Sequence, residues 1–367
     1  MNKKIRTFGI GMITVLWLIL AIFAWVTPAK DISQSERRPL TQFPALDADT
    51  LLSGKFMSGF EEYAVDQFPV RDTFRQVKSL FHYYVLGQKD NNGIYVKDGY
   101  AVKQEYPEDP ESIRHATDRF RYVYEKYLEQ TESKIYAAVI PDKNYYLAEE
   151  SGHLALNYPD LFAQVEEQMP YAEHIDLTGS LNQTSYYYTD THWRQESLLP
   201  VAQTLCNAMD MPAPDVAEFT ATKLQRPFYG VYYGQAALPL QPEDMYILES
   251  QRLNACRVYD FETGEYGEVY DLQKLDSKDI YDVFLSGAKS LLRIENPNAE
   301  TDRELIIFRD SFGSAVAPLL VSEYKTVILI DIRYISSELL DRYIKFKGQD
   351  VLFLYSASVL NNAATIK

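Results

Sequence analysis

The chain has 367 residues, of which 46% are hydrophobic and 24% charged, a composition that is typical of globular protein and excludes a disordered chain. Its formal net charge of −16 argues against a nucleic-acid-binding protein, because phosphate binding requires clustered lysine and arginine. Tyrosine is frequent, with 29 residues, and we interpret most of them as half-buried residues of strands and helices, although their flat rings also suit sugar surfaces.

The amino terminus has the pattern of a membrane anchor. Residues 1–7 form a basic tail, and residues 8–27 then run for twenty residues without a charge. That length crosses a bilayer once, and basic residues before the span predict a cytoplasmic amino end. A cleavable signal peptide is the alternative, but its apolar core is usually shorter and ends in small residues. We therefore expect a single-pass protein of the cell membrane whose main domain is extracytoplasmic.

The region after the predicted span begins with a tether. Residues 28–52 are polar and interrupted by prolines, which is typical of a linker. From 53 to 85 apolar residues recur at intervals of three and four, which predicts two helices separated at Phe68-Pro69. Asn91-Asn92-Gly93 predicts a tight turn that leads into a hairpin. We take residues 53–367 as one extracytoplasmic domain.

Short apolar runs alternate with helical patterns along the rest of this domain. Such alternation predicts an α/β fold with a parallel sheet flanked by helices. Residues 246–269 alternate instead like strands of a small antiparallel insertion, and Gly230 and Gly234 predict a loop whose backbone approaches a ligand closely. Helices are expected at 108–133, 161–169, 196–209 and 337–346, and buried strands at 135–140, 175–177, 305–308, 326–330 and 351–355.

The two cysteines, Cys206 and Cys256, lack the spacing and the histidine partners of a zinc site, so we predict no metal. We interpret them as two buried thiols. A disulfide between them stays open as the alternative if the domain lies outside the cytoplasm. The chain also contains no glycine-rich phosphate loop of the usual spacing, and we predict no cofactor.

Two short motifs carry the residues of a nucleophilic site. Asp190 lies two residues before His192, and a carboxylate that fixes the tautomer of a histidine turns it into a general base. Ser311 follows the predicted strand 305–308, where a sharp turn would expose its hydroxyl. A serine in such a turn is often only a helix cap, so the prediction depends on the two motifs lying together. We predict a catalytic triad of Asp190, His192 and Ser311.

A third polar group follows the strand predicted at 135–140. Ligands of open α/β sheets bind beyond the carboxyl ends of the strands, so Asp142, Lys143 and Asn144 lie where a substrate would bind. The alternative interpretation is a solvated turn that caps the next helix.

The chain resembles the DHHW family at Tyr188-Thr189-Asp190-Thr191-His192-Trp193 and at Arg309-Asp310-Ser311-Phe312-Gly313. Further blocks, such as Asp66-Gln67-Phe68-Pro69-Val70-Arg71-Asp72, occur in the same order. The name motif of the family reads Asp-His-His-Trp, whereas Thr191 replaces its first histidine here. We expect Asp190 and His192 to stay paired, because the side chain between them points elsewhere.

The resemblance implies an anchored extracytoplasmic protein related to the SGNH-type alginate O-acetyltransferases, with an SGNH-hydrolase-like domain and a triad in the chain order Asp, His, Ser. In that chemistry His192 takes the proton of Ser311, which attacks an acyl carbonyl, and a sugar hydroxyl or water then attacks the acyl-enzyme. The N–H groups of Ser311 and Gly313 would hold the oxyanion. Other side chains expected to order the site or contact an anionic sugar are Asp310, Trp193, Arg194, Lys143 and Asn144.

Three functions stay open at this point. The first is an O-acyltransferase that acetylates an exopolysaccharide or cell-wall glycan and receives acyl groups from a separate membrane-bound acyltransferase. The second is a carbohydrate esterase that has the same triad and uses water as the acceptor. The third is a non-catalytic glycan-binding scaffold, for which the two motifs would coincide by accident.

Overall fold

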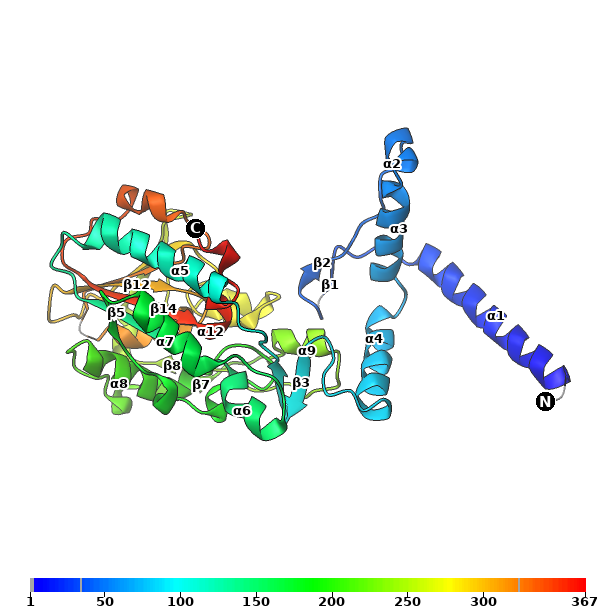
Figure 1. Cartoon of the computed structure of the whole chain (residues 1–367), viewed down its shortest axis with the longest axis horizontal. Helices are drawn as coiled ribbons and strands as arrows, with labels where there is room; N and C mark the ends of the chain where they lie inside the picture. Colours follow the sequence, from blue (N-terminus) through cyan, green and yellow to red (C-terminus); the bar gives the residue numbers. More distant parts are fainter. Residues whose placement is uncertain (1–2, 34, 323) are drawn as a thin grey trace. The chain divides into compact units, whose positions relative to one another are not determined.

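The computed structural model describes residues 3–33, 35–322 and 324–367, so Met1 and Asn2 of the predicted basic tail lie outside the described residues. The chain forms two compact units (Figure 1). One comprises the residues up to Asn91 together with 233–239, and the other comprises 92–232 and 240–367. The second unit, called the α/β unit below, therefore begins at Asn92, whereas the predicted domain begins at 53. The helices between 53 and Asn91 belong to the first unit.

The N-terminal unit begins with helix α1 (Lys3–Val26). Its segment Ile5–Val26 is long and apolar enough to cross a membrane, as a membrane anchor or as a signal sequence. The elements that follow are β1 (Ile32–Ser33), β2 (Arg38–Pro39), α2 (Ala48–Leu52), α3 (Lys55–Asp66), α4 (Arg71–Leu80) and the π-helical turn η1 (Phe81–Val85).

The predicted tether folds back on α3. Arg38 donates two hydrogen bonds to the carboxylate of Asp66, at 2.9 and 2.6 Å, and its guanidinium holds the pKa of Asp66 well below the usual range. The ring of Phe43 packs edge-on against those of Phe56 and Tyr63. These contacts explain why residues 28–52 form part of a compact unit rather than a free linker.

The second unit is built on an eight-stranded sheet with the order β10-β9-β11-β13-β12-β14-β5-β6. The five strands from β13 to β6 run parallel, and β11, β9 and β10 continue the sheet in antiparallel pairing. The strands are β5 (Ile135–Ile140), β6 (Glu173–His174), β9 (Arg257–Asp260), β10 (Glu265–Gly267), β11 (Leu291–Glu295), β12 (Glu304–Arg309), β13 (Thr326–Ile330) and β14 (Asp350–Ser356).

The predicted antiparallel insertion is therefore only partly a separate piece. Strand β11, which the sequence pattern did not predict, pairs with both β13 and β9 and so joins β9 and β10 to the main sheet. Two small antiparallel pairs of this unit are separate from the main sheet. They are the hairpin of β3 (Ile94–Lys97) with β4 (Tyr100–Lys103), and the pair of β7 (Thr220–Lys223) with β8 (Tyr246–Glu249).

Alternate residues of the parallel strands enter two different cores, because successive side chains of a strand point to opposite faces. Ile307 lies in the core that includes α8 (Leu199–Ala208), and Phe308 lies in the core that includes α5 (Pro110–Val123) and α7 (Tyr158–Gln168). Figure 1 shows α5 and α7 lying along the sheet. Cys206 and Cys256 are buried in the first core, and neither forms a disulfide.

Two predicted elements differ from the structure. In place of the strand predicted at 175–177, the structure has β6, which ends at His174. Asp176 accepts a hydrogen bond from the backbone N–H of Thr178 and so starts a turn. The helix predicted at 337–346 is a shorter 3-10 helix, η10 (Ser337–Arg342). The remaining α-helices are α6 (Lys143–Ser151), α9 (Val231–Ala236), α10 (Gln251–Ala255), α11 (Gly313–Val316) and α12 (Ala357–Leu360).

Candidate active site

The serine lies at the carboxyl edge of the parallel strands, in the turn between β12 and α11. Asp310, which precedes it, accepts a hydrogen bond through Oδ1 from the N–H of Phe312 at 3.0 Å. Its Oδ2 accepts from the N–H of Ser356, the last residue of the neighbouring strand β14, at 2.8 Å. Asp310 thereby fixes the turn that presents Ser311 to the edge of the sheet.

The loop that carries Asp190 and His192 meets this turn. Asp190 Oδ1 lies 2.6 Å from Nδ1 of His192, and His192 Nε2 lies 2.7 Å from Oγ of Ser311. Because an ionised carboxylate only accepts hydrogen bonds, Nδ1 carries the imidazole proton, and Nε2 accepts from the serine hydroxyl. The second carboxylate oxygen of Asp190 accepts from the N–H of Val231 at 2.8 Å. The structure thus joins a carboxylate, an imidazole and a hydroxyl in a single hydrogen-bonded chain.

Aromatic side chains hold the imidazole and connect its loop to the serine turn. The ring of Tyr281 stacks on that of His192, with centroids 3.9 Å apart and planes inclined by 11°. The fully buried indole of Trp193 donates a hydrogen bond through Nε1 to the carbonyl oxygen of Phe312 at 3.1 Å. Trp193 was predicted as a substrate residue, and the structure instead places it between the two loops of the site.

A family model matches this part of the chain. It is described as DHHW protein, and it matches residues 170–330. The chain resembles the DHHW family, as its motifs predicted. The match covers a little under half of the chain and includes Asp190, His192 and Ser311. No curated protein matches the chain.

Solved structures share the fold. A DHHW family protein from Eubacterium siraeum is 20% identical, with a TM-score of 0.61 and coverage of 76% of this chain and 95% of that one. Bacillus cereus PatB1 is 18% identical, with a TM-score of 0.59 and coverage of 73% and 96%. The O-acetyltransferase domain of Pseudomonas putida AlgJ is more distant, at 14% identity and a TM-score of 0.46, with coverage of 73% and 92%. The first two structures confirm the predicted α/β fold.

The structure shows how Thr191 and Gly230 fit the segment 188–193, which carries the DHHW motif and is called the DHHW loop below. Thr191, at the position of the missing histidine, does not interrupt the contact between Asp190 and His192. Part of the segment predicted as a loop around Gly230 and Gly234 is the helix α9, and Gly230, directly before it, packs against the motif. A Cβ on Gly230 would lie 2.2 Å from the carbonyl oxygen of Thr189. Only a glycine therefore fits beside the backbone of the DHHW loop.

The predicted oxyanion donors differ in availability. The N–H of Gly313 donates to the carbonyl oxygen of Asp310 at 3.1 Å, so the turn itself uses this donor. For the N–H of Ser311, no acceptor is found in the described parts of the chain. Gly313 is small for a packing reason, because a Cβ there would lie 2.7 Å from Cβ of Arg309. The oxyanion role is thus supported for Ser311 and not for Gly313.

Lys143 is a structural lysine beneath the DHHW loop. Its Nζ donates to the carbonyl oxygens of Ala101 at 2.6 Å, Tyr187 at 2.8 Å and Tyr188 at 3.3 Å. The side chain is almost fully buried, and burial lowers its pKa to about 7. The prediction that Lys143 orients an anionic sugar is therefore replaced by a role in holding the loop that precedes Asp190.

Neighbouring candidates are also engaged within the protein. Asn144 accepts a hydrogen bond from the hydroxyl of Tyr95 at 2.8 Å and donates to the carbonyl oxygen of Leu154 at 3.2 Å. Asp142 caps α6 and accepts from the hydroxyl of Tyr158 at 2.7 Å, and burial raises its pKa to about 6. Asp142 thus caps the next helix, as the alternative interpretation expected, although the turn is buried rather than solvated. The substrate role of these residues stays a prediction.

Arg194 belongs to an ion pair that the sequence pattern did not predict. Its guanidinium pairs with the buried carboxylate of Glu243, which also accepts hydrogen bonds from the N–H groups of Tyr188 at 2.9 Å and Thr189 at 3.0 Å. Arg194 also donates through Nε to the carbonyl oxygen of Tyr186 at 3.0 Å. Glu243 and Arg194 therefore fix the backbone of the loop directly before Asp190.

Proposed function

We propose that this chain is a membrane-anchored extracytoplasmic O-acyltransferase that transfers an acyl group, in the first place acetyl, to hydroxyls of an exopolysaccharide or cell-wall glycan. The observation that carries the proposal is the contact of 2.7 Å between His192 Nε2 and Ser311 Oγ, with Asp190 on the opposite nitrogen of the ring. Two motifs 119 residues apart make this contact, which a non-catalytic scaffold would not require.

The first half of the proposed reaction forms an acyl-serine. His192 Nε2 takes the hydroxyl proton of Ser311 while Oγ attacks the carbonyl carbon of the acyl donor. The N–H of Ser311 donates to the oxyanion of the tetrahedral intermediate, and the loss of one such donor typically costs about 3 kcal/mol. The imidazolium then gives its proton to the leaving group of the donor, and Asp190 stabilises the charged ring meanwhile.

The second half of the reaction releases the serine. His192 takes a proton from a glycan hydroxyl, and that oxygen attacks the acyl-serine carbonyl. Collapse of the intermediate leaves the acyl ester on the glycan, and the imidazolium returns its proton to Ser311. An esterase would follow the same steps with water as the acceptor, so the two functions differ in the acceptor alone.

The N-terminal helix supports a proposed position for the enzyme. We assign Ile5–Val26 to one membrane crossing with the amino end in the cytoplasm, which places the site outside. We include in the proposal a separate membrane-bound acyltransferase that passes acyl groups outward to this site.

The test uses the full-length chain in detergent micelles and a serine-reactive fluorophosphonate. We expect labelling of the natural chain, none of Ser311→Ala, and normal labelling of Ser277→Ala, in which an exposed serine of the same unit is removed. Acetyl transfer from a chromogenic acetyl ester is then measured with and without a glycan acceptor. Faster turnover with acceptor supports the transferase, and equal turnover identifies an esterase. Unchanged labelling of Ser311→Ala would overturn both enzymatic functions.

A further inference from the structure

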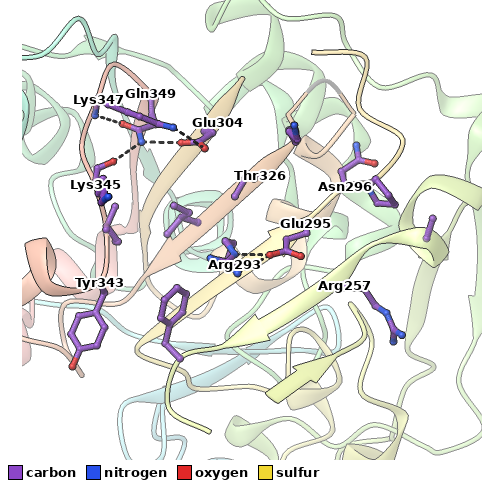
Figure 2. A pocket seen from close by; sticks show the side chains of 16 residues that line it. Arg257, Arg293, Glu295, Asn296, Glu304, Thr326, Tyr343, Lys345, Lys347 and Gln349 are labelled. Carbon is purple, nitrogen blue, oxygen red and sulfur yellow. Dashed lines mark hydrogen bonds and ion pairs between the residues drawn. The ribbon is translucent and has the colours of Figure 1, made fainter. Parts of the chain in front are cut away.

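A cavity of about 630 Å³ lies at the edge of the sheet opposite to Ser311 (Figure 2). Its lining includes Glu304 and Thr326, the first residues of the parallel strands β12 and β13. Ser311 follows the other end of β12, whose six residues span about 20 Å at 3.3 Å each. The cavity is therefore separate from the candidate active site, and its volume falls in the range that holds one small ligand.

The cavity is basic although the chain is strongly acidic. Seven charged side chains line it, of which five are basic and two are carboxylates, whereas the whole chain has a net charge of −16. Such a local excess of positive charge attracts anions to a place that the rest of the surface repels. The charged residues are Arg257, Arg293, Lys325, Lys345, Lys347, Glu295 and Glu304.

Two of these cations, Arg257 and Lys345, form no ion pair within the described residues, although Glu295 lies opposite Arg257 in the pairing of β11 with β9. Lys325 pairs with Asp302, Lys347 pairs with Glu304, and Arg293 pairs with Glu295. No carboxylate within residues 3–33, 35–322 and 324–367 forms an ion pair with Arg257 or Lys345. Figure 2 shows Lys345 on one side of the view and Arg257 on the other, with Arg293 between them. Arg257 and Lys345, which form no ion pair in the part of the chain that the structure describes, thus line the same cavity.

The loop that carries the lysines is held in place by a buried amide. Gln349 donates through Nε2 to Glu304 at 2.9 Å and to the carbonyl oxygen of Lys345 at 2.8 Å. Its Oε1 accepts from the N–H of Lys347 at 2.8 Å. All three contacts form without a ligand, so the basic side of the cavity is pre-organised, and binding costs less ordering entropy.

Aromatic rings line the same cavity. Phe261 and Tyr343 contact each other edge to face, with centroids 6.3 Å apart, and Tyr343 is 50% exposed. The guanidinium of Arg293 lies 5.6 Å from the centre of the Phe261 ring, which orients that cation. An exposed ring beside several basic side chains offers an apolar surface to a flat ligand and positive charge to its anionic group.

We propose that this cavity binds anionic sugar units of a glycan, which carry a carboxylate or a phosphate. Lys345 and Arg257, on opposite sides of the cavity, pair with anionic groups of neighbouring sugar units, and Tyr343 stacks on the ring of one of them. The site is independent of the chemistry at Ser311, so it holds a polymer at one end of the sheet whether or not the other end is catalytic.

The experiment is calorimetric titration of the full-length chain in an uncharged detergent with three oligomers of equal length. The first is oligogalacturonate, which carries carboxylates. The second is a cello-oligosaccharide phosphorylated on its 6-hydroxyls, and the third is the same cello-oligosaccharide without phosphate, which is neutral. We expect at least one anionic oligomer to bind, the neutral one not to bind, and the affinity to fall as salt rises, because salt screens exposed charges. The anionic oligomer that binds identifies the anionic group as a carboxylate or a phosphate.

Variants locate the binding. Arg257→Gln with Lys345→Gln is expected to weaken the anionic oligomer roughly tenfold or more, since two charge-assisted contacts are lost. Arg114→Gln with Lys278→Gln removes the same charge from other exposed positions of the unit and is expected to leave the affinity unchanged. Tyr343→Ala is expected to weaken the oligogalacturonate arm as well.

The outcome for Ser311→Ala separates this proposal from the proposed function. That variant is expected to bind the oligomer as the natural chain does. Absence of binding by both anionic oligomers, equal binding of the neutral one, or full affinity in the cavity variant would overturn the proposal. Should the cavity variant fail to fold, the salt series on the natural chain decides.

Discussion

The indole Nε1 of Trp193 donates a hydrogen bond of 3.1 Å to the carbonyl oxygen of Phe312, and this bond fastens the loop of His192 to the turn of Ser311. The two segments come from distant parts of the chain, so a small displacement of either one would change the distance between the imidazole and the hydroxyl. Reacting groups tolerate little displacement, because the rate depends steeply on alignment.

Trp193→Phe is expected to lower both stability and activity. The phenyl ring keeps most of the buried surface but leaves the Phe312 carbonyl without its donor, which typically costs about 1–3 kcal/mol. Urea unfolding measures this loss, and the kcat of acetyl transfer is expected to fall with it. Trp25→Phe, at an exposed position of α1, should change neither quantity. Equal behaviour of the two variants would show that the hydrogen bond does not matter.

Asp190→Asn is expected to reduce kcat/KM by roughly 10³–10⁴-fold while the fold persists. The amide can donate to Nδ1, which would move the imidazole proton to Nε2 and remove the acceptor that Ser311 needs. Transfer assays on the full-length chain measure the effect. The control is Asp118→Asn on the exposed surface of α5, which should keep full activity. A loss of less than tenfold for Asp190→Asn would speak against its role.

Tyr281→Leu and Tyr281→Phe form a matched pair. The hydroxyl of Tyr281 is buried and finds no hydrogen-bond partner in the described residues, so the phenylalanine variant is expected to be as stable as the natural chain or more stable. Leucine removes the ring that stacks on His192, and we expect a lower kcat, because the imidazole is no longer held flat. The order of kcat and of Tm among the three chains is the measurement. Equal kcat for the leucine and phenylalanine variants would contradict the stacking role.

Gly230→Ala is expected to destabilise the protein by about 1–3 kcal/mol or more, because the new Cβ would lie 2.2 Å from the Thr189 carbonyl oxygen. The strain falls on the backbone next to Asp190, so activity should fall further than stability alone accounts for. Gly179→Ala places a Cβ where no atom lies within 4 Å and serves as the control. Thermal unfolding compares the two, and an unaffected Gly230→Ala variant would show that the two loops can separate freely.

Lys143→Met is expected to change how stability depends on pH. Burial lowers the pKa of Lys143 from 10.5 to about 7, so between these values the unfolded chain binds a proton that the folded chain does not. The free energy of unfolding of the natural chain therefore contains a contribution that rises as pH increases from 7 to 10.5, and the methionine variant lacks it. Urea unfolding at several pH values measures the slope. Lys278→Met, at an exposed lysine, should keep the natural slope. Parallel curves for the natural chain and Lys143→Met would refute this expectation.

Most of the secondary structure and the residues of the candidate triad can be predicted from local patterns in the sequence. Apolar runs such as 305–308 and 326–330 predict buried strands, because a short run of apolar residues indicates a segment that is covered on both faces. The pair of Asp190 and His192 could also be recognised, because the two residues lie only two positions apart in the sequence. The DHHW resemblance rested on these same residues.

Which segments are neighbours in space could not be predicted from the sequence. Strand β11 joins the antiparallel strands to the main sheet, and its short sequence does not reveal its two partners. Lys143 and Glu243 support the DHHW loop from distant positions, and in sequence they resemble ordinary surface charges. The basic cavity likewise gathers residues from 257 to 347, so no local pattern could indicate it. The hydrophobic pattern of a segment indicates whether that segment is buried. Which segments contact one another depends on the strand order of the whole sheet.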